Sequence, residues 1–409
     1  MTPEAVRIGG PGVVLDDAQI QTFVREQLDG VPLDGRSVCM IVPDGTRSCP
    51  LPLLLSAVDG ALQGRVTRLT VLVALGTHAA MDEPALAAHL GPGICGRNHE
   101  WWNPDTFVSV GRIGAQRIEE LSRGMLRHGI EVRINRAVVE HDVTLIVGPV
   151  FPHEVVGFSG GNKYLFPGVS GQELIDVSHW LGALITSAEM IGTRGITPVR
   201  ALIDEAASLV PGERFAFCLV VQSGSGNLHA AAFGDPRSAW AAAVDVAAET
   251  HVRYLDAPVR RVLSLIPRKY EDMWTGAKGF YKVEPIVADG GQVVIYAPHI
   301  REVSVMHPHI AEIGYHCRDY FLGQWDRFRD APWGDLAHST HLRGAGTYDP
   351  VAGERLRVTV TLATGIPEEQ VRAINLDYLD PALVDPDAWA ADPGTLVVPQ
   401  AGEVLYRLR

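Results

Sequence analysis

The stretch VTLIVGPVFPH, residues 143–153, is an apolar run that ends in a histidine. Its nearly continuous Val, Leu and Ile content is typical of a strand that is buried on both faces of a parallel sheet. Two earlier stretches have the same form, SVCMIVPD at residues 37–44 and TVLVALGTH at residues 70–78. Because ligands gather at the carboxyl ends of strands in an open parallel sheet, the polar residues that close these three runs are predicted to mark a site.

Helical patterns lie between and beside these runs. The apolar spacing predicts helices over residues 16–28, 51–62, 83–90 and 122–129. Strands that alternate with helices favour a largely parallel α/β sheet over an all-helical or all-β architecture.

The second half of the chain repeats this alternation. The predicted strands there are residues 261–267, 291–299, 355–365 and 394–399, and a helix is predicted over residues 367–374. Residues 241–261 read as a helix that runs into a crossing segment. Since 409 residues exceed one ordinary core, we expect two α/β domains, residues 1–255 and 256–409.

Composition and charge exclude several classes of protein. The formal net charge of −13 argues against nucleic acid or an anionic membrane as the main partner. No basic stretch followed by an apolar run opens the chain, and no 18-residue apolar window occurs, so neither a signal peptide nor a membrane span is expected. The five cysteines lack CxxC spacing, which favours reduced thiols over disulfides or a zinc ribbon. A cytoplasmic enzyme is the expectation.

The glycine-rich stretch GFSGGNKYLFPGVSG, residues 157–171, surrounds Lys163. Glycines allow close backbone approach to a ligand, and the lysine suggests an anionic or electrophilic partner. A phosphate-binding P-loop is a poor match, because Asn162 replaces its second glycine and Tyr164 replaces its magnesium-binding hydroxyl. The dinucleotide fingerprint Gly-x-Gly-x-x-Gly is not matched either. A glycine turn with a solvated lysine remains the alternative.

Further chemically active residues accompany this lysine. His153 lies ten residues before it and His179 sixteen residues after it, while DGTR (residues 44–47) and GTH (residues 76–78) close the first two runs. A single histidine is more often structural than catalytic. The combined set offers acid/base groups, a metal ligand, a carboxylate and a nucleophilic amine.

The ordered set DGTR, GTH and PHEVVGFSGGNKYLFPGV, followed by His179, resembles the nickel-dependent lactate racemase family. Weaker likeness continues through KGFYKVEPIVADGG, residues 278–291, to LYRL, residues 405–408. The resemblance therefore covers nearly the whole chain. It implies two α/β domains with largely parallel sheets and an active site at their interface.

The resemblance also implies a cofactor, the nickel pincer nucleotide (a nickel pyridinium-3-thioamide-5-thiocarboxylic acid mononucleotide). On that pattern the cofactor is covalently attached at Lys163, and His179 supplies a nickel ligand, for which imidazole is well suited. The resemblance assigns the remaining cofactor contacts to Asp44, Gly45, Thr46, Arg47, Gly160 and Gly161. Enzymes that build the cofactor are the implied transient partners.

The implied reaction is racemisation or epimerisation of a small 2-hydroxy acid at its α-carbon. The α-hydrogen leaves as hydride to the cofactor, which avoids carbanion charge beside a carboxylate. His78 and His153 match the two catalytic histidines, Arg47 assists them or holds the carboxylate, and Lys278 grips the substrate. Thr275 stands where lactate racemase has a glutamine, which suggests a substrate larger or more polar than lactate.

Other hypotheses are left open by the sequence. One is a zinc-dependent hydrolase built on His316, His338 and His341, although HSTH lacks the glutamate of HExxH. Another is a non-catalytic cofactor-binding protein. THLRGAGTYD, residues 340–349, is either a substrate-facing loop with Arg343 as a contact or a structural loop.

Two further features have no settled role. CGRNHEWW, residues 95–102, is either a lid or a packing element. His307 and His309 receive no role.

Overall fold

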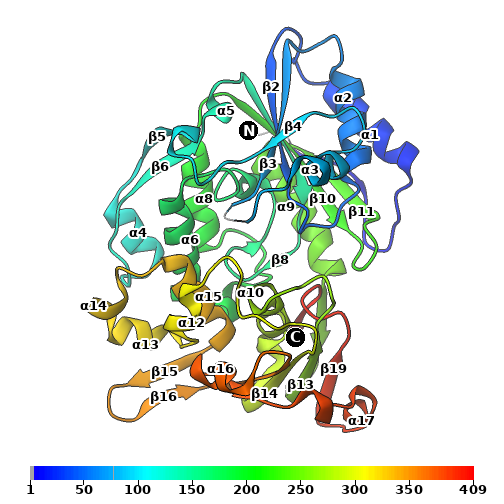
Figure 1. The fold of residues 1–409 in the computed structure, drawn as a ribbon. Helices are drawn as coiled ribbons and strands as arrows, with labels where there is room; N and C mark the ends of the chain where they lie inside the picture. Colours follow the sequence, from blue (N-terminus) through cyan, green and yellow to red (C-terminus); the bar gives the residue numbers. More distant parts are fainter. Residues whose placement is uncertain (1–3, 77) are drawn as a thin grey trace. The chain divides into compact units, whose positions relative to one another are not determined.

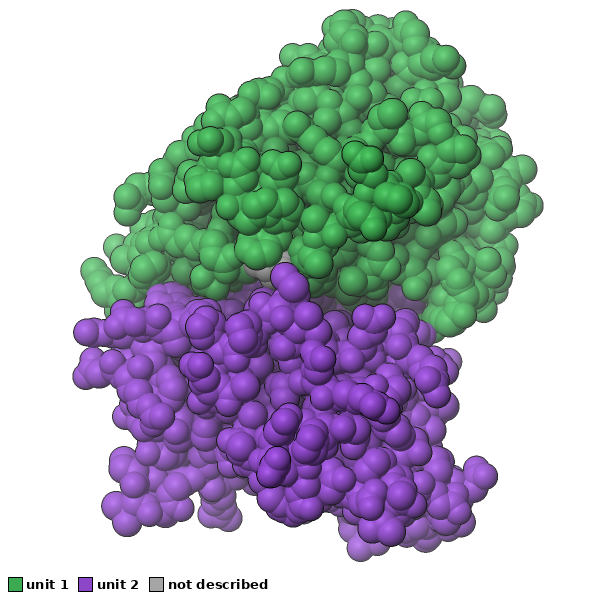
Figure 2. Space-filling view, in the orientation of Figure 1, with its two compact units in different colours: residues 1–151, 158–178, 194–250 green, residues 152–157, 179–193, 251–409 purple. Residues whose placement is uncertain are grey.

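The computed structural model describes residues 4–76 and 78–409. Met1–Pro3 and Thr77, the middle residue of GTH, lie outside the described residues. The chain divides into two compact units, coloured separately in Figure 2. Unit 1 comprises Met1–Phe151, Phe158–Ser178 and Arg194–Thr250, and unit 2 comprises Pro152–Gly157, His179–Thr193 and His251–Arg409. The division at Thr250 lies close to the expected boundary of 255, but two segments expected in the first domain cluster with unit 2.

Unit 1 is built on a seven-stranded sheet in the order β1-β11-β10-β7-β2-β3-β4 (Figure 1). Its strands are β1 (Val6–Gly9), β2 (Ser37–Pro43), β3 (Arg68–Ala74), β4 (Gly96–Asn98), β7 (Val143–Pro149), β10 (Glu213–Val221) and β11 (Leu228–Gly234). The neighbours from β10 to β4 are parallel, and β11 and β1 complete the sheet in antiparallel pairing. The three predicted strands of the first half and the largely parallel sheet are confirmed.

Alternation of side chains explains why these strands are buried on both faces. Val38, Met40 and Val42 of β2 belong to one core cluster, together with apolar residues of helices α1 (Asp17–Asp29) and α2 (Leu51–Leu62). The intervening Cys39 and Ile41 are also fully buried and point to the opposite face. The helices α3 (Glu83–Leu90), α8 (Pro198–Ser208) and α9 (Pro236–Thr250) complete the main helices of unit 1.

The helix predicted over residues 122–129 is wrong. The helix in this region is α4 (Ala115–Leu121), and it ends where Arg123 and Gly124 adopt φ angles of 58° and 85°. The Gly124 N–H donates to the Glu119 carbonyl at 2.7 Å, which closes the helix. The apolar spacing of Met125 and Leu126 therefore reflects packing of a turn.

The remaining elements of the first 250 residues are mostly short, except for one helix of 14 residues. They are η1 (Pro104–Thr106), β5 (Phe107–Ile113), β6 (Ile130–Asn135), α5 (Arg136–Val139), β8 (Pro152–His153), β9 (Gly157–Phe158), η2 (Gly161–Tyr164), α6 (Gln172–Ile185) and α7 (Ser187–Met190). By the division of the chain, α6 begins in unit 1 and ends in unit 2.

Unit 2 has its own five-stranded sheet, in the order β18-β17-β14-β13-β19, and all its neighbours are parallel. The strands are β13 (Val259–Leu265), β14 (Val287–Ala297), β17 (Val358–Thr364), β18 (Asp377–Tyr378) and β19 (Thr395–Val398). Two-stranded pairs are formed by β12 (Val252–Leu255) with β20 (Leu405–Leu408) and by β15 (Gly346–Asp349) with β16 (Gly353–Leu356). The strands predicted in the second half are confirmed.

The helices of unit 2 are short. They are α10 (Met273–Gly276), α11 (Lys278–Tyr281), η3 (Glu284–Ile286), α12 (His309–Ile313), α13 (Arg318–Gly323), α14 (Trp325–Phe328), α15 (Trp333–Arg343), α16 (Glu368–Ala373), η4 (Pro381–Leu383) and α17 (Pro386–Ala390). Among the residues that the structure describes, no helix is long and apolar enough to cross a membrane. The five cysteines are all free.

Candidate functional site

Asp44 and His78 meet at the carboxyl edge of the unit 1 sheet. Strands β2 and β3 are parallel neighbours, with Pro43 paired to Ala74, so the residues that follow them lie at the same edge. His78 donates its Nδ1–H to Asp44 Oδ2. Thr46 donates to the other carboxylate oxygen through its backbone N–H at 3.1 Å and its hydroxyl at 2.6 Å. Both oxygens of a buried carboxylate are thereby satisfied.

The surroundings of Asp44 keep it ionised. Burial alone would raise its pKa, but hydrogen bonds and charges oppose this effect. The hydrogen bond and charge of His78, with Arg47 and Thr46, outweigh burial and hold the pKa of Asp44 below its ordinary range. A permanent carboxylate therefore faces Nδ1 of His78.

The turn over residues 44–47 is held by few contacts. The Arg47 N–H donates to the Asp44 carbonyl at 3.2 Å, and the Arg47 guanidinium lies 5.3 Å from the centre of the Phe151 ring. A Cβ placed on Gly45 would meet only Met81 Sδ, at 3.9 Å. Space is therefore left beside this turn.

The backbone of His78 is anchored by a tryptophan. Trp101 Nε1 donates to the His78 carbonyl at 3.0 Å, while His99, two residues earlier, is fully buried. Trp101 also makes an edge contact with Trp102, which is half exposed. For residues 95–102, these contacts favour packing over a lid.

Lys163 lies in the short helix η2, and a buried arginine holds the backbone that leads into this helix. Arg200 of α8 is 1% exposed and donates to the carbonyls of Gly160, at 3.0 Å, and Phe158, at 2.5 Å. Its guanidinium lies 4.3 Å from the centre of the Trp240 ring. Burial lowers the pKa of Arg200 to about 10, so it stays charged at neutral pH. The sequence pattern around Lys163 did not reveal this support.

Gly160 and Gly161 are required by the packing of the protein itself. Both have positive φ angles, 86° and 58°. A Cβ on Gly160 would approach Val150 Cγ2 to 2.4 Å, and one on Gly161 would approach the Pro236 carbonyl to 2.9 Å. At both glycines a side chain would therefore collide with other atoms of the protein. The cofactor contact that the resemblance assigns to them stays a prediction.

A second group of site residues lies in unit 2. His153 and Glu154 follow each other in and after β8, with His153 Nδ1 3.4 Å from Glu154 Oε2. Burial tends to raise the pKa of Glu154, but the charges of His153, His341 and Lys278 and a backbone hydrogen bond lower it below its ordinary range. Lys278 also lies 5.0 Å from the centre of the Tyr270 ring. An ionised carboxylate therefore sits among three nitrogen bases.

The two proposed acid/base histidines are held in different ways. The Val155 N–H lies 3.2 Å from His153 Nδ1 and donates to it, so the proton of a neutral His153 ring is on Nε2. His78 gives its Nδ1–H to Asp44, so its neutral ring carries a lone pair on Nε2. In their neutral forms, Nε2 of His153 therefore carries a proton and can donate a hydrogen bond, whereas Nε2 of His78 carries a lone pair and can accept one.

His341 is the least satisfied group of unit 2. It is 4% exposed, and within residues 4–76 and 78–409 neither ring nitrogen has a hydrogen-bond partner. Burial lowers its pKa to about 4, against the opposing charge of Glu154. A neutral imidazole always has one donor and one acceptor, so this ring is poised for a polar ligand.

Trp274 and Thr275 have structural partners. The Trp274 ring is stacked between His307 and His338, with both centroid distances at 3.8 Å. The Thr275 hydroxyl donates to Asp272 Oδ1 at 2.7 Å, within the cap of α10. Its only proton is thus used inside the protein, and a substrate contact by Thr275 is limited to accepting a hydrogen bond.

The histidines of the zinc hypothesis do not form a metal site. His316 Nδ1 hydrogen-bonds Glu354 at 2.7 Å and its ring stacks on Tyr320, whereas His338 Nε2 hydrogen-bonds the Trp274 carbonyl at 3.0 Å. No group of three or more His, Cys, Asp or Glu that could hold a metal ion occurs in the described part of the chain. The zinc hydrolase hypothesis therefore has no structural support.

The remaining assigned residues lie on two helices, His179 in the middle of α6 and Arg343 at the end of α15. His179 is half-buried in α6, next to Trp180, which is fully buried and stacks on Trp325. Arg343 ends α15, followed by Gly344 with a φ of 78° and by strand β15. The expected loop over residues 340–349 is therefore a helix end and a strand. Burial lowers the pKa of Arg343, and the charges of Glu354 and Asp377 oppose this effect.

Several residues that lie in or support the candidate site were given no such role from the sequence. Glu154 had a signal, since it adjoins His153, and His341 was considered only as a zinc ligand. Trp101 stood only within the stretch 95–102, whose role was left open, and its partner is 23 residues away in the chain. Arg200 had no signal, because its partners are 40–42 residues away.

Comparisons with known proteins show what the chain is similar to. Residues 20–192 match the family model described as the lactate racemase N-terminal domain. The chain is similar to a lactate racemase from Thermoanaerobacterium thermosaccharolyticum, 27% identical over 148 residues, which is 35% of this chain and 32% of that protein. It is also similar to a lactate racemase from Lactiplantibacillus plantarum, 25% identical over 158 residues, 38% of this chain and 35% of that protein. The match thus spans about a third of the curated relatives' length.

Solved structures resemble nearly the whole chain. A crystal structure of a Thermotoga maritima protein from a structural genomics consortium is 31% identical, with a TM-score of 0.87, over 98% of this chain and 100% of that one. The lactate racemase apoprotein from T. thermosaccharolyticum is 18% identical, with a TM-score of 0.73 and the same coverage. At that identity the second likeness concerns the fold.

Proposed function

Because the chain belongs to the lactate racemase family, we propose that it is an isomerase that inverts the α-carbon of a small 2-hydroxy acid. The observation that carries the proposal is the Asp44–His78 hydrogen bond at the carboxyl edge of the unit 1 sheet. It orients an imidazole with Nε2 available for proton exchange and lies inside the matched residues 20–192.

On this proposal His78 and His153 are the two acid/bases. His78 Nε2 accepts the substrate hydroxyl proton and becomes the imidazolium. His153, which begins as the imidazolium beside the ionised Glu154, donates its Nε2 proton when the substrate returns with the opposite configuration, and becomes neutral. In the reverse direction the two exchange roles. Arg47 and Lys278 hold the substrate carboxylate, and the carboxylate of Asp44 stabilises the His78 imidazolium that forms.

The residues fit the nickel pincer nucleotide in their chemistry, which makes it the proposed cofactor. Lys163 offers the primary amine to which the group is joined, and His179 offers an imidazole nitrogen for nickel. The open space beside Gly45 leaves room near the 44–47 turn. When bound, the group supplies a reversible acceptor for the α-hydrogen as hydride.

The polar environment of unit 2 supports a substrate more polar than lactate. His341 has a donor and an acceptor without partners among the described residues, and Glu154 beside it is ionised. We propose that the substrate carries a further hydroxyl or other polar group beyond its α-carbon. A His341→Phe variant should then lose activity toward polar 2-hydroxy acids more than toward lactate.

The test is intact mass and nickel content of protein produced together with enzymes that build the cofactor. The expected result is one added mass at Lys163 and about one nickel per chain, both absent from Lys163→Arg. A panel of enantiopure 2-hydroxy acids is then followed for inversion, with α-deuterated substrate to see whether deuterium returns independently of solvent.

Each outcome of these measurements is informative. An unmodified Lys163 without nickel would contradict the cofactor assignment. Loaded protein that inverts no member of the panel would instead favour the non-catalytic cofactor-binding alternative.

A further inference from the structure

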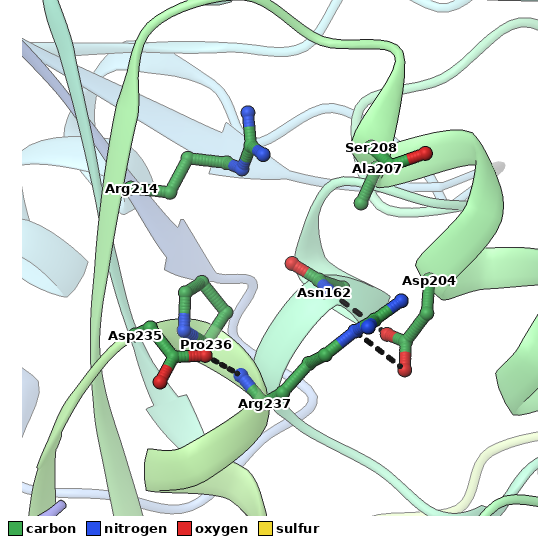
Figure 3. Close-up of a pocket in the computed structure, with 8 residues that line it drawn as sticks. All are labelled: Asn162, Asp204, Ala207, Ser208, Arg214, Asp235, Pro236 and Arg237. Carbon is green, nitrogen blue, oxygen red and sulfur yellow. Dashed lines mark hydrogen bonds and ion pairs between the residues drawn. The ribbon is translucent and has the colours of Figure 1, made fainter. Parts of the chain in front are cut away.

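A pocket of about 280 Å³ lies in unit 1, and its lining residues include none of the assigned catalytic side chains. One lining residue, Asn162, directly precedes Lys163 in the chain. Its wall is formed by Asn162 at the start of η2, Asp204 and Ser208 of α8, Arg214 of β10, and Asp235 and Arg237 at the start of α9 (Figure 3). A single water occupies about 30 Å³ of liquid, so the pocket has room for a small organic molecule.

The first observation is a buried amide with one half unused. Asn162 is 6% exposed, and its Nδ2 donates to Asp204 Oδ1 at 2.9 Å. Because a carboxylate only accepts, this contact assigns Nδ2 to Asp204 and turns Oδ1 the other way, as Figure 3 shows. Within the described residues Oδ1 has no hydrogen-bond partner. A buried acceptor of this kind requires a donor.

A second acceptor is on Asp235, another of the residues that line the pocket. Asp235 caps α9, its Oδ1 accepting from the backbone N–H groups of Arg237 at 3.1 Å and Ser238 at 3.3 Å. Its Oδ2 is buried and finds no donor in the part of the chain that the structure describes. The start of the helix is already satisfied by Oδ1, so Oδ2 is left for a ligand.

The third observation is an arginine without a counter-charge. Arg214 donates Nη1 to the Val210 carbonyl at 2.5 Å, but it makes no ion pair with any carboxylate of residues 4–76 and 78–409. Arg237 instead pairs with Asp204 Oδ2 at 3.3 Å. Burial, and then the charge of Arg237, lower the pKa of Arg214. The pocket therefore lacks an anion at Arg214.

We propose that this pocket is a second small-molecule site, and that its ligand is a small carboxylic acid that also carries hydroxyl or amino donors. The carboxylate pairs with Arg214, and the donors bond Asn162 Oδ1 and Asp235 Oδ2. The proposal does not rest on the proposed reaction.

Occupation of the pocket also acts on the lysine turn. The Asn162 carbonyl accepts from the N–H groups of Leu165 and Phe166, both at 3.0 Å, and Lys163 follows Asn162 directly. A ligand that fixes the Asn162 side chain therefore stabilises the turn that carries Lys163.

The experiment is calorimetric titration of the whole protein with glycerate, serine, propionate and inorganic phosphate. Glycerate and serine distinguish hydroxyl from amino donors, and propionate has neither. The expected result is binding of glycerate or serine at least about tenfold tighter than that of propionate, with slower amide exchange at Leu165 and Phe166.

The variants Arg214→Gln and Ser208→Leu should weaken this binding about tenfold or more, the first by removing the charge and the second by filling the pocket from an exposed position. Arg194→Gln is the matched control, because Arg194 faces Asp245 about two turns further along α9. Equal affinity for glycerate, serine and propionate, preference for phosphate, or affinity unchanged in both Arg214→Gln and Ser208→Leu would overturn the proposal.

Discussion

His78, which follows strand β3, donates its Nδ1–H to the carboxylate of Asp44, which follows the neighbouring strand β2. The two residues are 34 positions apart in the chain. Parallel pairing of β2 with β3 brings them together, and Thr46 completes the hydrogen bonding of the carboxylate. The pair determines which nitrogen of His78 can exchange a proton.

Asp44→Asn should impair catalysis more than folding. The amide retains the shape but loses the charge that stabilises a protonated His78, so inversion should fall about 10²–10³-fold in both directions. Asp142→Asn is the control, because Asp142 also receives hydrogen bonds from β2, through the backbone and hydroxyl of Ser37 at the strand's other end. Rates of inversion and thermal unfolding check both variants, and equal losses of activity would contradict the role of Asp44.

Arg200→Met should destabilise the lysine turn. The change leaves the carbonyls of Phe158 and Gly160 without their donor in a buried place, which should cost about 2–4 kcal/mol in the free energy of unfolding. Arg117→Met is the control. It removes an arginine of α4 that is 40% exposed and pairs with Glu205, a residue on the same helix as Arg200, and it should cost below about 1 kcal/mol. Urea unfolding measures both, and similar costs would show that Arg200 is not a structural support.

Glycine substitutions separate packing from ligand approach. Gly148→Ala should destabilise the protein by about 1–3 kcal/mol, because a Cβ there would lie 2.3 Å from Tyr164 Cζ. Gly45→Ala should leave the melting temperature unchanged, since the nearest atom is 3.9 Å away. Loss of nickel and cofactor mass from Gly45→Ala, with stability intact, is the expected sign that the cofactor lies against the 44–47 turn. Full loading would count against that contact.

The free energy of unfolding should decrease as the pH is lowered from 6.5 to 4, because of His341. Its pKa is lowered from 6.5 to about 4 in the folded protein, so in this range the unfolded chain binds the extra proton. Acid therefore favours unfolding, and at pH 4.5 the effect of this one group reaches about 2–3 kcal/mol relative to pH 7. His341→Phe should reduce the pH dependence of the unfolding free energy by that amount. An unchanged dependence would mean that His341 does not stay neutral in the fold.

The periodicity of the chain predicted both sheets, because buried strands and amphipathic helices leave local apolar patterns. It failed at residues 122–129, where the local pattern suits a helix but positive φ angles at Arg123 and Gly124 end one. The motifs around Asp44, His78, His153 and Lys163 were likewise visible as ordered polar residues after apolar runs.

The sequence by itself thus determined the strands and the α/β class and marked the candidate reactive residues, since these patterns depend on neighbours within a few positions. Only the tertiary structure decided that His78 pairs with Asp44, that Arg200 holds the lysine turn, and that Gly160 and Gly161 pack against the protein itself. It also decided that His338 belongs to a ring stack and that His341 is left without partners among the described residues. These relationships join residues far apart in the chain, and their geometry follows from strand order and side-chain packing, which no local pattern encodes.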